Sequence, residues 1–415
     1  MPYFLAKTVD IFLSYWWIYS PIVLFLLFRA LWLVYIQTLT AKAINWVLLE
    51  VKIPKEILKT PKAMEQFFAG LSGVKSGANF VEKWWEGKIQ QWMSCEIVGK
   101  NGDIYFFIRT PVGFRNLVEA NIYSQYPDAE IKEAPDYVFD VPEDVPNKDY
   151  NLWGTEFVLV KEDAYPIRTY IAFEEQVEEK RLDPLSNLAE VLSKLKDGEQ
   201  IWLQYLVKPA DDEWKKKGDA LVAKLIGKKI PSKEGPLWKA LVWVGQFFRD
   251  LIIGLYKIPE QLSADEKKEA MASLMQYLSP GEKEVVAAIE MNLSKIGMDT
   301  AIRFIYIGRS DIFSRGNISA IIGTFKLFNT LNLNGFRPNK LASTSVDYFF
   351  KKRREYAKKR RLLNAYKLRM FTSKPFVLNI EEWATIYHYP TYIIEAPTVR
   401  RIEAKKGEPP IGLPT

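Results

Sequence analysis

The sequence is poor in the residues that build redox, metal and nucleophilic sites. Its 415 residues include one cysteine, Cys95, and one histidine, His388. A single cysteine excludes a disulfide within the chain and fits a reducing compartment. One cysteine and one histidine do not make a zinc site of the usual kind, and no Ser-His-Asp set stands out. We therefore predict a protein that is not an enzyme, with no catalytic residues, no metal and no cofactor.

A second absence concerns nucleotide hydrolysis. The phosphate-loop pattern G-x-x-x-x-G-K-[ST] does not occur in the chain. That loop needs its glycines so that backbone N–H groups can approach the phosphates, and it needs its lysine to meet their charge. We expect that any ATPase motor acting with this chain is on another polypeptide.

The positive charge of the chain is concentrated in one segment. The net charge is +7, and residues 351–369, KKRREYAKKRRLLNAYKLR, hold ten basic residues and one acid, which is +9. The rest of the chain therefore carries 7 − 9 = −2. Any attraction of an anionic partner must come from this segment. The hydrophobic fraction of 48% and the aromatic fraction of 14% argue for a folded chain with a sizeable core.

A long apolar run near the N-terminus predicts a membrane-spanning helix. Residues 11–28, IFLSYWWIYSPIVLFLLF, are eighteen residues without a charge, and residues 30–36 are apolar again after Arg29. Such a run is long enough to cross a bilayer. Trp16 near one end and Trp32 near the other suit the aromatic belts of the two interfaces, and Arg29 can snorkel toward headgroups.

The lysines after this run set its orientation. Residues 42–62 contain five lysines and two glutamates, whereas Lys7 and Asp10 balance each other before the run. The positive-inside rule then places the body of the protein in the cytoplasm, so we predict a single-pass protein of the cytoplasmic (inner) membrane. A cleaved signal peptide is the alternative, but the run is too long and the charge lies on the wrong side.

A second apolar segment, residues 237–257, has helical periodicity, and its polar residues fall on one narrow stripe. The wide apolar face suits a helix lying in the membrane interface. The same pattern is typical of a core or subunit-interface helix, and periodicity does not separate the two. The residues predicted to face lipid are Trp238, Leu241, Phe248, Leu251, Ile252 and Leu255.

The soluble part predicts an α+β fold with strand-strand-helix-strand units, the order of half a ferredoxin-like sandwich. The first unit has an Asn-Gly hairpin turn at Asn101, and Ser279 with Glu282 forms a capping-box pattern that starts a later helix. The second unit consists of predicted strands at 156–160, 167–173 and 201–207 around a helix at 185–195.

The predicted domains follow from these elements. They are a transmembrane anchor at 1–45, ferredoxin-like units at 46–140 and 150–230, an amphipathic interfacial helix at 235–258, a C-terminal α/β unit with a long basic helix at 260–390, and an extended tail at 391–415.

The basic segment is the main candidate binding site. Its two basic quartets start seven residues apart, so in a helix they share one side. Such a face binds nucleic-acid phosphates, with an affinity that falls steeply as salt rises. It equally suits anionic lipid or an acidic partner, or a solvated helix that keeps the protein soluble. The eight residues are Lys351, Lys352, Arg353, Arg354, Lys358, Lys359, Arg360 and Arg361.

Several segments together resemble a family from candidate-phylum bacteria, in which a membrane-anchored domain of unknown function accompanies a HerA- or FtsK-like ATPase of the type IV secretion and conjugation class. The most distinctive is FVLNIEEWATIYHYPTYIIEAPTVRRIEAKKGEPPIGL at 376–413, which looks like the stretch leading into such a motor domain. The others are LLEVKIPKE (48–56), TPKAMEQFF (60–68), EANIYSQYPDAEI (119–131), DPLSNLAEVLSKLKDGEQIWLQYLVKP (183–209), AIRFIYIG (301–308) and NISAIIGTFKLFNTLNLNGF (317–336).

The resemblance implies a role rather than a reaction. We expect a non-catalytic, oligomeric membrane component of a type IV secretion-like or DNA-transfer machine that docks a separate ATPase and contacts DNA. Trp383, Tyr387 and His388 form a candidate docking knob, and the alternative for them is core packing. The rival functions are a membrane-tethered nucleic-acid-binding protein without a motor, and an envelope structural protein that binds anionic lipid.

Overall fold

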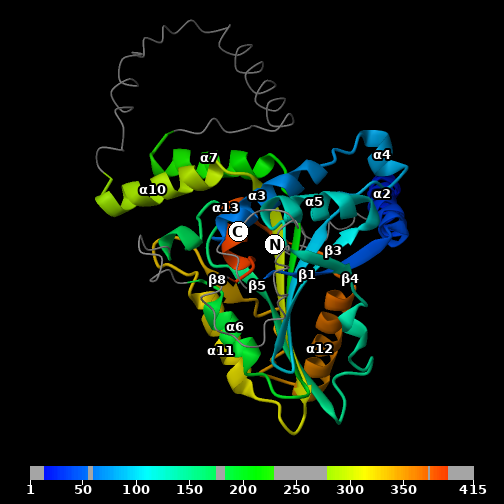
Figure 1. The fold of residues 1–415 in the computed structure, drawn as a ribbon. Coiled ribbons are helices and arrows are strands. Elements are labelled where there is room, and N and C mark those ends of the chain that lie inside the picture. Colours follow the sequence, from blue (N-terminus) through cyan, green and yellow to red (C-terminus); the bar gives the residue numbers. More distant parts are fainter. Residues whose placement is uncertain (1–13, 55–58, 174–182, 229–277, 373, 391–415) are drawn as a thin grey trace, which may run out of the picture.

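The computed structural model describes residues 14–54, 59–173, 183–228, 278–372 and 374–390. Their fold is α+β, and its centre is one sheet of nine strands in the order β4-β1-β3-β2-β6-β7-β5-β8, with β9 also paired to β7 (Figure 1). All of these pairings are antiparallel. The strands are β1 (Trp46–Lys52), β2 (Met93–Lys100), β3 (Asp103–Pro111), β4 (Glu130–Glu133), β5 (Tyr150–Leu159), β6 (Glu199–Pro209), β7 (Gly297–Arg309), β8 (Phe336–Pro338) and β9 (Phe376–Asn379).

Helices cover both faces of this sheet. They are α2 (Trp16–Ala43), α3 (Lys62–Leu71), α4 (Phe80–Trp84), α5 (Arg115–Gln125), α6 (Ser186–Ser193), α7 (Glu213–Leu225), α10 (Pro280–Leu293), α11 (Arg315–Lys326), α12 (Lys351–Lys367) and α13 (Ile380–Ile386). Short 3-10 turns are η1 (Ser72–Val74), η2 (Val112–Phe114), η3 (Tyr137–Phe139) and η4 (Tyr170–Ala172). In Figure 1, α12 lies on one side of the sheet, and α6 and α11 lie on the other.

The local signals of the sequence formed as predicted. Asn101 and Gly102 both have positive φ, at 54° and 89°, which is the geometry of a tight hairpin turn between β2 and β3. The capping box of Ser279 and Glu282 starts α10. In both cases the residues that decide the structure are close together in the chain.

One predicted strand is wrong. Residues 167–169 are irregular and η4 follows, so no strand forms over 167–173. The backbone N–H of Ile167 donates to Glu382 Oε1 at 2.8 Å, and that of Tyr170 donates to Thr385 Oγ1 at 2.9 Å. Because α13 supplies these acceptors, the segment has no need of a neighbouring strand.

The strands of all three predicted soluble regions join one sheet. β2 pairs with β6, and β6 pairs with β7 over eleven residues, from Glu199–Gly308 to Pro209–Met298. β6 and β7 therefore lie at the centre of the sheet. Side chains alternate between its faces: Leu203 and Tyr205 enter the larger core, while Trp202 enters the smaller one.

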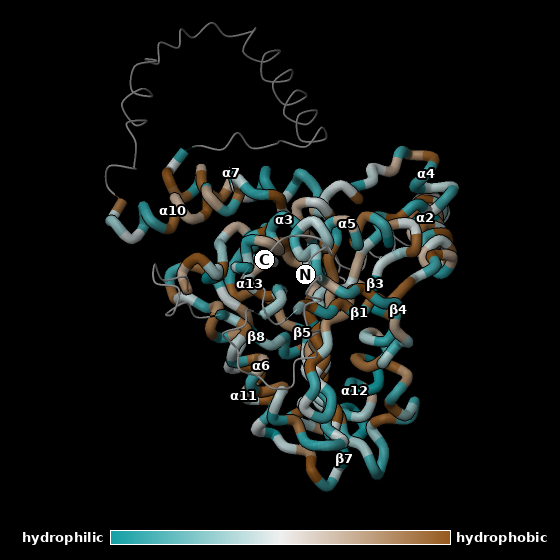
Figure 2. Tube along the Cα trace, viewed as in Figure 1, coloured by the Kyte–Doolittle hydropathy of each residue, from teal (hydrophilic) through white to brown (hydrophobic). Residues whose placement is uncertain are grey.

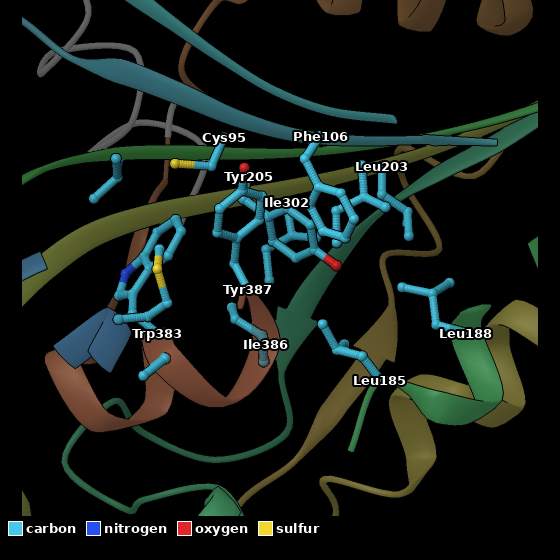
Figure 3. Packing of buried hydrophobic residues seen from close by; sticks show 14 of the residues in the cluster. Cys95, Phe106, Leu185, Leu188, Leu203, Tyr205, Ile302, Trp383, Ile386 and Tyr387 are labelled. Atoms are coloured by element: carbon cyan, nitrogen blue, oxygen red, sulfur yellow. The ribbon is translucent and has the colours of Figure 1, made fainter. Parts of the chain in front are cut away.

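The larger core lies under α3, α5, α6, α11 and α13. Figure 3 shows its centre, where Trp383 of α13 and Tyr387, the residue that follows α13, meet Tyr205 of β6. Cys95 is buried in the same cluster, and burial raises the pKa of its thiol, so it is a core residue. The smaller core lies under α12 and residues 137–145.

The N-terminal helix α2 is rich in apolar residues, and Figure 2 shows brown segments in it. Within it, Ser20–Ala43 is long and apolar enough to cross a membrane. Only 6% of its apolar window is buried, which is unlike a core helix of a soluble protein.

Trp383 is the largest side chain that α13 places in the core. It is fully buried, and its Nε1 donates to Thr300 Oγ1 at 2.8 Å. We expect Trp383→Ala to lower the free energy of unfolding by about 3–5 kcal/mol, because it leaves a cavity at the centre of the sheet. Urea unfolding of the detergent-solubilised protein measures this. Leu331→Ala is the control, since Leu331 is fully exposed and its removal should cost less than about 0.5 kcal/mol.

Glu382 gives the fold an unusual dependence on pH. Burial raises the pKa of its carboxyl to about 7 from the ordinary 4.5, although Oε2 accepts the backbone N–H of Asn379 and Oε1 that of Ile167. Between these values the folded protein binds more protons than the unfolded chain, so its stability should fall as pH rises through this window and level off above it.

Glu382→Gln should flatten this part of the stability profile, measured by urea unfolding at a series of pH values. Glu282→Gln is the matched control. Glu282 occupies the same capping-box position in α10 but is exposed, and the backbone N–H of Ser279 lowers its pKa. A slope that survives Glu382→Gln would contradict the assignment.

Candidate nucleic-acid interface

The basic helix α12 has two halves with different surroundings. In the C-terminal half, Leu362, Leu363 and Tyr366 are buried against the sheet, and the Tyr366 ring lies 5.3 Å from that of Trp202. In the N-terminal half the side chains point away from the core and are mostly exposed. The apolar residues of the C-terminal half thus hold α12 against the sheet. The exposed basic residues lie in its N-terminal half.

All four residues of the first basic quartet, Lys351–Arg354, are exposed, and Lys351 lies 4.0 Å from the carboxylate of Glu355 one turn along the helix. It occupies the first turn of α12, which has no acidic residue and no side-chain cap. The positive end of the helix dipole lies at this turn, so each cation there is unfavourable by about 0.3–1 kcal/mol at low salt. A bound anion is attracted by the positive end of the helix dipole. It also reduces the repulsion among the four basic side chains.

Three aromatic residues precede this quartet. Tyr348, Phe349 and Phe350 are between 76% and 85% exposed. Phe350 has φ 55°, a left-handed conformation that a bulky residue rarely adopts, and the chain enters α12 through it. Exposed rings beside cations make a surface on which bases can stack while phosphates are neutralised.

Most of the second quartet serves the fold. Lys358 Nζ donates to Ser343 O at 2.9 Å, and Lys359 Nζ donates to Asn151 Oδ1 at 2.8 Å. Arg360 donates to the backbone carbonyls of Glu143 and Val145. These three side chains are half-buried, whereas Arg361 is exposed. Burial lowers the pKa of Lys359. The two quartets that the sequence groups together therefore differ in what they can bind.

A cavity of about 400 Å³ opens beside the first quartet, between α12, the start of α11 and β5. Three cations and two carboxylates line it, together with the hydroxyls of Ser319, Thr344 and Ser345. The charged residues are Arg315, Lys351, Lys359, Asp347 and Glu355. The lining of the cavity therefore carries a net charge of +1, and Arg315 extends the basic surface from α12 onto α11.

A buried ionic network holds the far end of α12, and the sequence analysis missed it. Arg369 is 1% exposed and its φ is 48°. Its Nε and Nη2 donate to the two oxygens of Glu96 at 2.9 and 3.1 Å, and its Nη1 and Nη2 donate to Asp136 at 2.5 and 2.8 Å. Glu96 also accepts hydrogen bonds from Ser94 at 2.6 Å and Tyr137 at 2.7 Å.

The charges in this network stabilise each other. Burial alone would raise the pKa of Glu96, but the guanidinium of Arg369 and the hydroxyl donors hold it below its ordinary value. The same carboxylates raise the pKa of Arg369 against the effect of its burial. Both side chains are therefore ionised in the core. One sequence signal was present: Glu96 is flanked by Cys95 on one side and by Ile97 and Val98 on the other, and a charge among apolar neighbours is typical of a buried, paired charge.

The candidate docking residues lie in the core rather than on the surface. Trp383 and Tyr387 are fully buried and His388 is 1% exposed. One ring nitrogen of His388, Nδ1, is 2.8 Å from Ala384 O, and the other, Nε2, is 2.9 Å from Asp183 Oδ1. These side chains therefore offer little exposed surface for direct contact with a partner, and their docking role stays a prediction. Their alternative assignment, aromatic core packing with a hydrogen-bonded histidine, is the one observed.

Two other predicted regions lie outside the described residues. They are the apolar segment 237–257, with Trp238, Leu241, Phe248, Leu251, Ile252 and Leu255, and the tail 391–415. Within the described part of the chain, no group of three or more His, Cys, Asp or Glu side chains could hold a metal ion.

Residues 33–401 match the model of a protein family described as a domain of unknown function, DUF8128. The chain belongs to the DUF8128 family. The match includes the whole sheet and both ends of α12, so the buried network and the basic surface are parts of the DUF8128 domain. No curated protein matches the chain.

The buried pair in this DUF8128 domain should be costly to break. We expect Arg369→Met to lower the free energy of unfolding by about 3–5 kcal/mol, because it leaves the Glu96 carboxylate buried without a counter-charge. The double variant Glu96→Gln/Arg369→Met should recover much of this loss, since a neutral amide needs no counter-charge.

Arg361→Met is the matched control, because Arg361 is exposed on the same helix. It should change the free energy of unfolding by less than about 0.5 kcal/mol. Chemical unfolding of the three variants measures the difference. Equal losses from Arg369→Met and Arg361→Met would contradict the role given to the buried pair.

Proposed function

We propose that this chain is a non-catalytic, membrane-anchored protein whose surface at residues 348–354 binds nucleic acid. The observation that carries the proposal is the separation of charge along α12. Lys358, Lys359 and Arg360 are held by the fold, whereas Lys351–Arg354 stay exposed beside three exposed aromatic rings.

The electrostatics of this surface favour an anionic polymer. Four cations share the first turn of a helix, where the dipole makes them unfavourable, and Arg315 adds a fifth across the adjoining cavity. Successive phosphates of a nucleic acid neutralise such a row with release of counterions. The rings of Tyr348, Phe349 and Phe350 favour single strands, because unpaired bases offer their faces for stacking.

The proposal extends to the setting in which this surface works. The resemblance of residues 376–413 to the stretch before conjugation-type motors supports a component of a type IV secretion-like or DNA-transfer machine. Its ATPase is then a separate polypeptide that docks outside Trp383, Tyr387 and His388. We also propose that the strand-strand-helix-strand segments are ferredoxin-like units and that the protein assembles into an oligomer.

The anchor in this proposal is α2, oriented with the sheet in the cytoplasm. Its length, its apolar composition and the lysines that follow it support this orientation. An anchored DNA-binding surface keeps nucleic acid near the membrane, where a transfer machine needs it.

Oligonucleotide binding by the full-length protein in detergent tests the proposal, with fluorescence anisotropy as the readout. The variant Lys351→Gln/Lys352→Gln/Arg353→Gln should weaken binding of a single-stranded oligonucleotide. It should also reduce the slope of log affinity against log salt by about two, since each lost phosphate contact removes about 0.7.

The matched control is Lys215→Gln/Lys216→Gln/Lys217→Gln on α7. These three lysines are also exposed and consecutive, so both variants lose three positive charges. Equal effects of the two variants would reject a local site. If the wild-type protein binds no oligonucleotide but binds anionic vesicles through Lys351–Arg353, the surface is a lipid site and the proposal falls.

A further inference from the structure

The short helix α4 lies against the C-terminal half of α2. Trp32 Nε1 donates to Trp84 O at 2.9 Å, and Thr40 Oγ1 donates to Glu86 O at 2.9 Å. The guanidinium of Arg29 lies over the Trp84 ring, 5.3 Å from its centroid. Figures 1 and 2 show α4 beside α2 at the same corner of the molecule. These contacts fix the height of α4 along α2.

The backbone after α4 also lies directly on α2. Gly87 has φ +67°, and a Cβ built on it would lie 2.7 Å from the carbonyl carbon of Ile36. Only glycine allows this approach and this conformation. At the other end, Asn79 and Glu82 form a capping box that defines the start of α4. A capping box thus defines the start of the five-residue helix, and the backbone that follows its end packs directly on α2.

Despite this, α4 presents large apolar side chains to the outside. Phe80 is 73% exposed, Trp85 71% and Val81 54%. We call these three residues the juxtamembrane face. Its polar neighbours Glu82 and Lys88 are paired with each other at 3.1 Å. Burial of each apolar side chain is worth about 1.5–3 kcal/mol, so exposing all three to water is costly.

The charges of α2 locate the membrane boundary next to this face. The sequence carries no charge from residue 11 to residue 28, and an uncharged run of eighteen residues is close to the length that a helix needs to cross the hydrocarbon of a bilayer. Arg29 is the first charge after them. A hydrocarbon region that ends at Arg29 therefore ends at the level of α4, because the Arg29 guanidinium lies over the Trp84 ring.

A span shifted toward Ala43 meets a physical objection. It would place Arg29 at the middle of the bilayer and carry Glu82, Lys83 and Glu86 into hydrocarbon with it, at a cost of several kcal/mol. With the boundary at Arg29, these charges reach the headgroups. Trp32, Trp84 and Trp85 then gather at the interface, where tryptophan is enriched.

We propose that α4 lies in the cytoplasmic membrane interface, with Phe80, Val81 and Trp85 inserted among the lipid headgroups and upper acyl chains. The occupant of the juxtamembrane face is the phospholipid bilayer that α2 crosses, because the face is continuous with α2. This inference rests on the proposed membrane anchor. It adds a second point of contact, which fixes the rotation of the sheet about α2.

Single-cysteine labelling of the full-length protein in phospholipid nanodiscs tests this. Cys95 is buried, so the native protein serves as the unlabelled blank. The variants Phe80→Cys, Val81→Cys and Trp85→Cys carry an environment-sensitive NBD fluorophore. Leu331→Cys is a control at a fully exposed position, and Leu24→Cys, in the uncharged part of α2, reports whether the anchor itself is in lipid.

We expect the labels at the juxtamembrane face to have blue-shifted emission and several-fold stronger quenching by spin-labelled lipid than the label at residue 331. If these labels behave like residue 331 while the label at residue 24 is in lipid, the inference is wrong and the anchor stands. If the label at residue 24 is also in water, both the anchor and the inference are wrong.

Discussion

The buried pair of Glu96 and Arg369 is the interaction on which the arrangement of this protein depends. It joins the middle of β2 to the end of α12, two elements separated by 273 residues in sequence. Both charges are in the core, and each offsets the desolvation cost of the other. The Asp136 carboxylate also accepts a hydrogen bond from Arg369. The pair also ties the C-terminal end of α12 to β2. The exposed basic end of the helix therefore has a defined position, which a helix held by apolar contacts alone would not guarantee.

The sequence predicts well those features that neighbouring residues decide. The hairpin turn at Asn101 and Gly102, the start of α10 at Ser279 and the apolar character of α2 all follow from residues a few positions apart. Features that distant residues decide were missed or wrong. Residues 167–173 resemble a strand, but Glu382, 215 positions from Ile167, takes up the hydrogen bond that a strand partner would make. The division of the basic segment into half-buried and exposed cations depends in the same way on the oxygens of Glu143, Asn151 and Ser343 that the second quartet contacts.

The aromatic residues of this chain fall into two classes that composition does not separate. Those of α13 are buried, and they fill the core beneath β6 and β7. Those at 348–350 and on α4 are exposed, and each group lies beside positive charge. A sequence pattern does not separate the two classes, because apolar periodicity shows which face of a helix is apolar but not what packs against that face. Only the tertiary contacts decide which rings are available to a partner.

The antiparallel sheet has a consequence for the order in which the protein can fold. Its central strand β7 pairs with β9, and α13 packs on α3, although β9 and α13 are the last elements of the described chain and α3 is among the first. The core is therefore incomplete until residues 376–386 have been synthesised. During translation the apolar faces of β6 and β7 lack their final cover, and such long-range pairing is slow. A newly made chain thus passes through an aggregation-prone stage, for which protection by a chaperone or early tethering at a membrane would be an advantage.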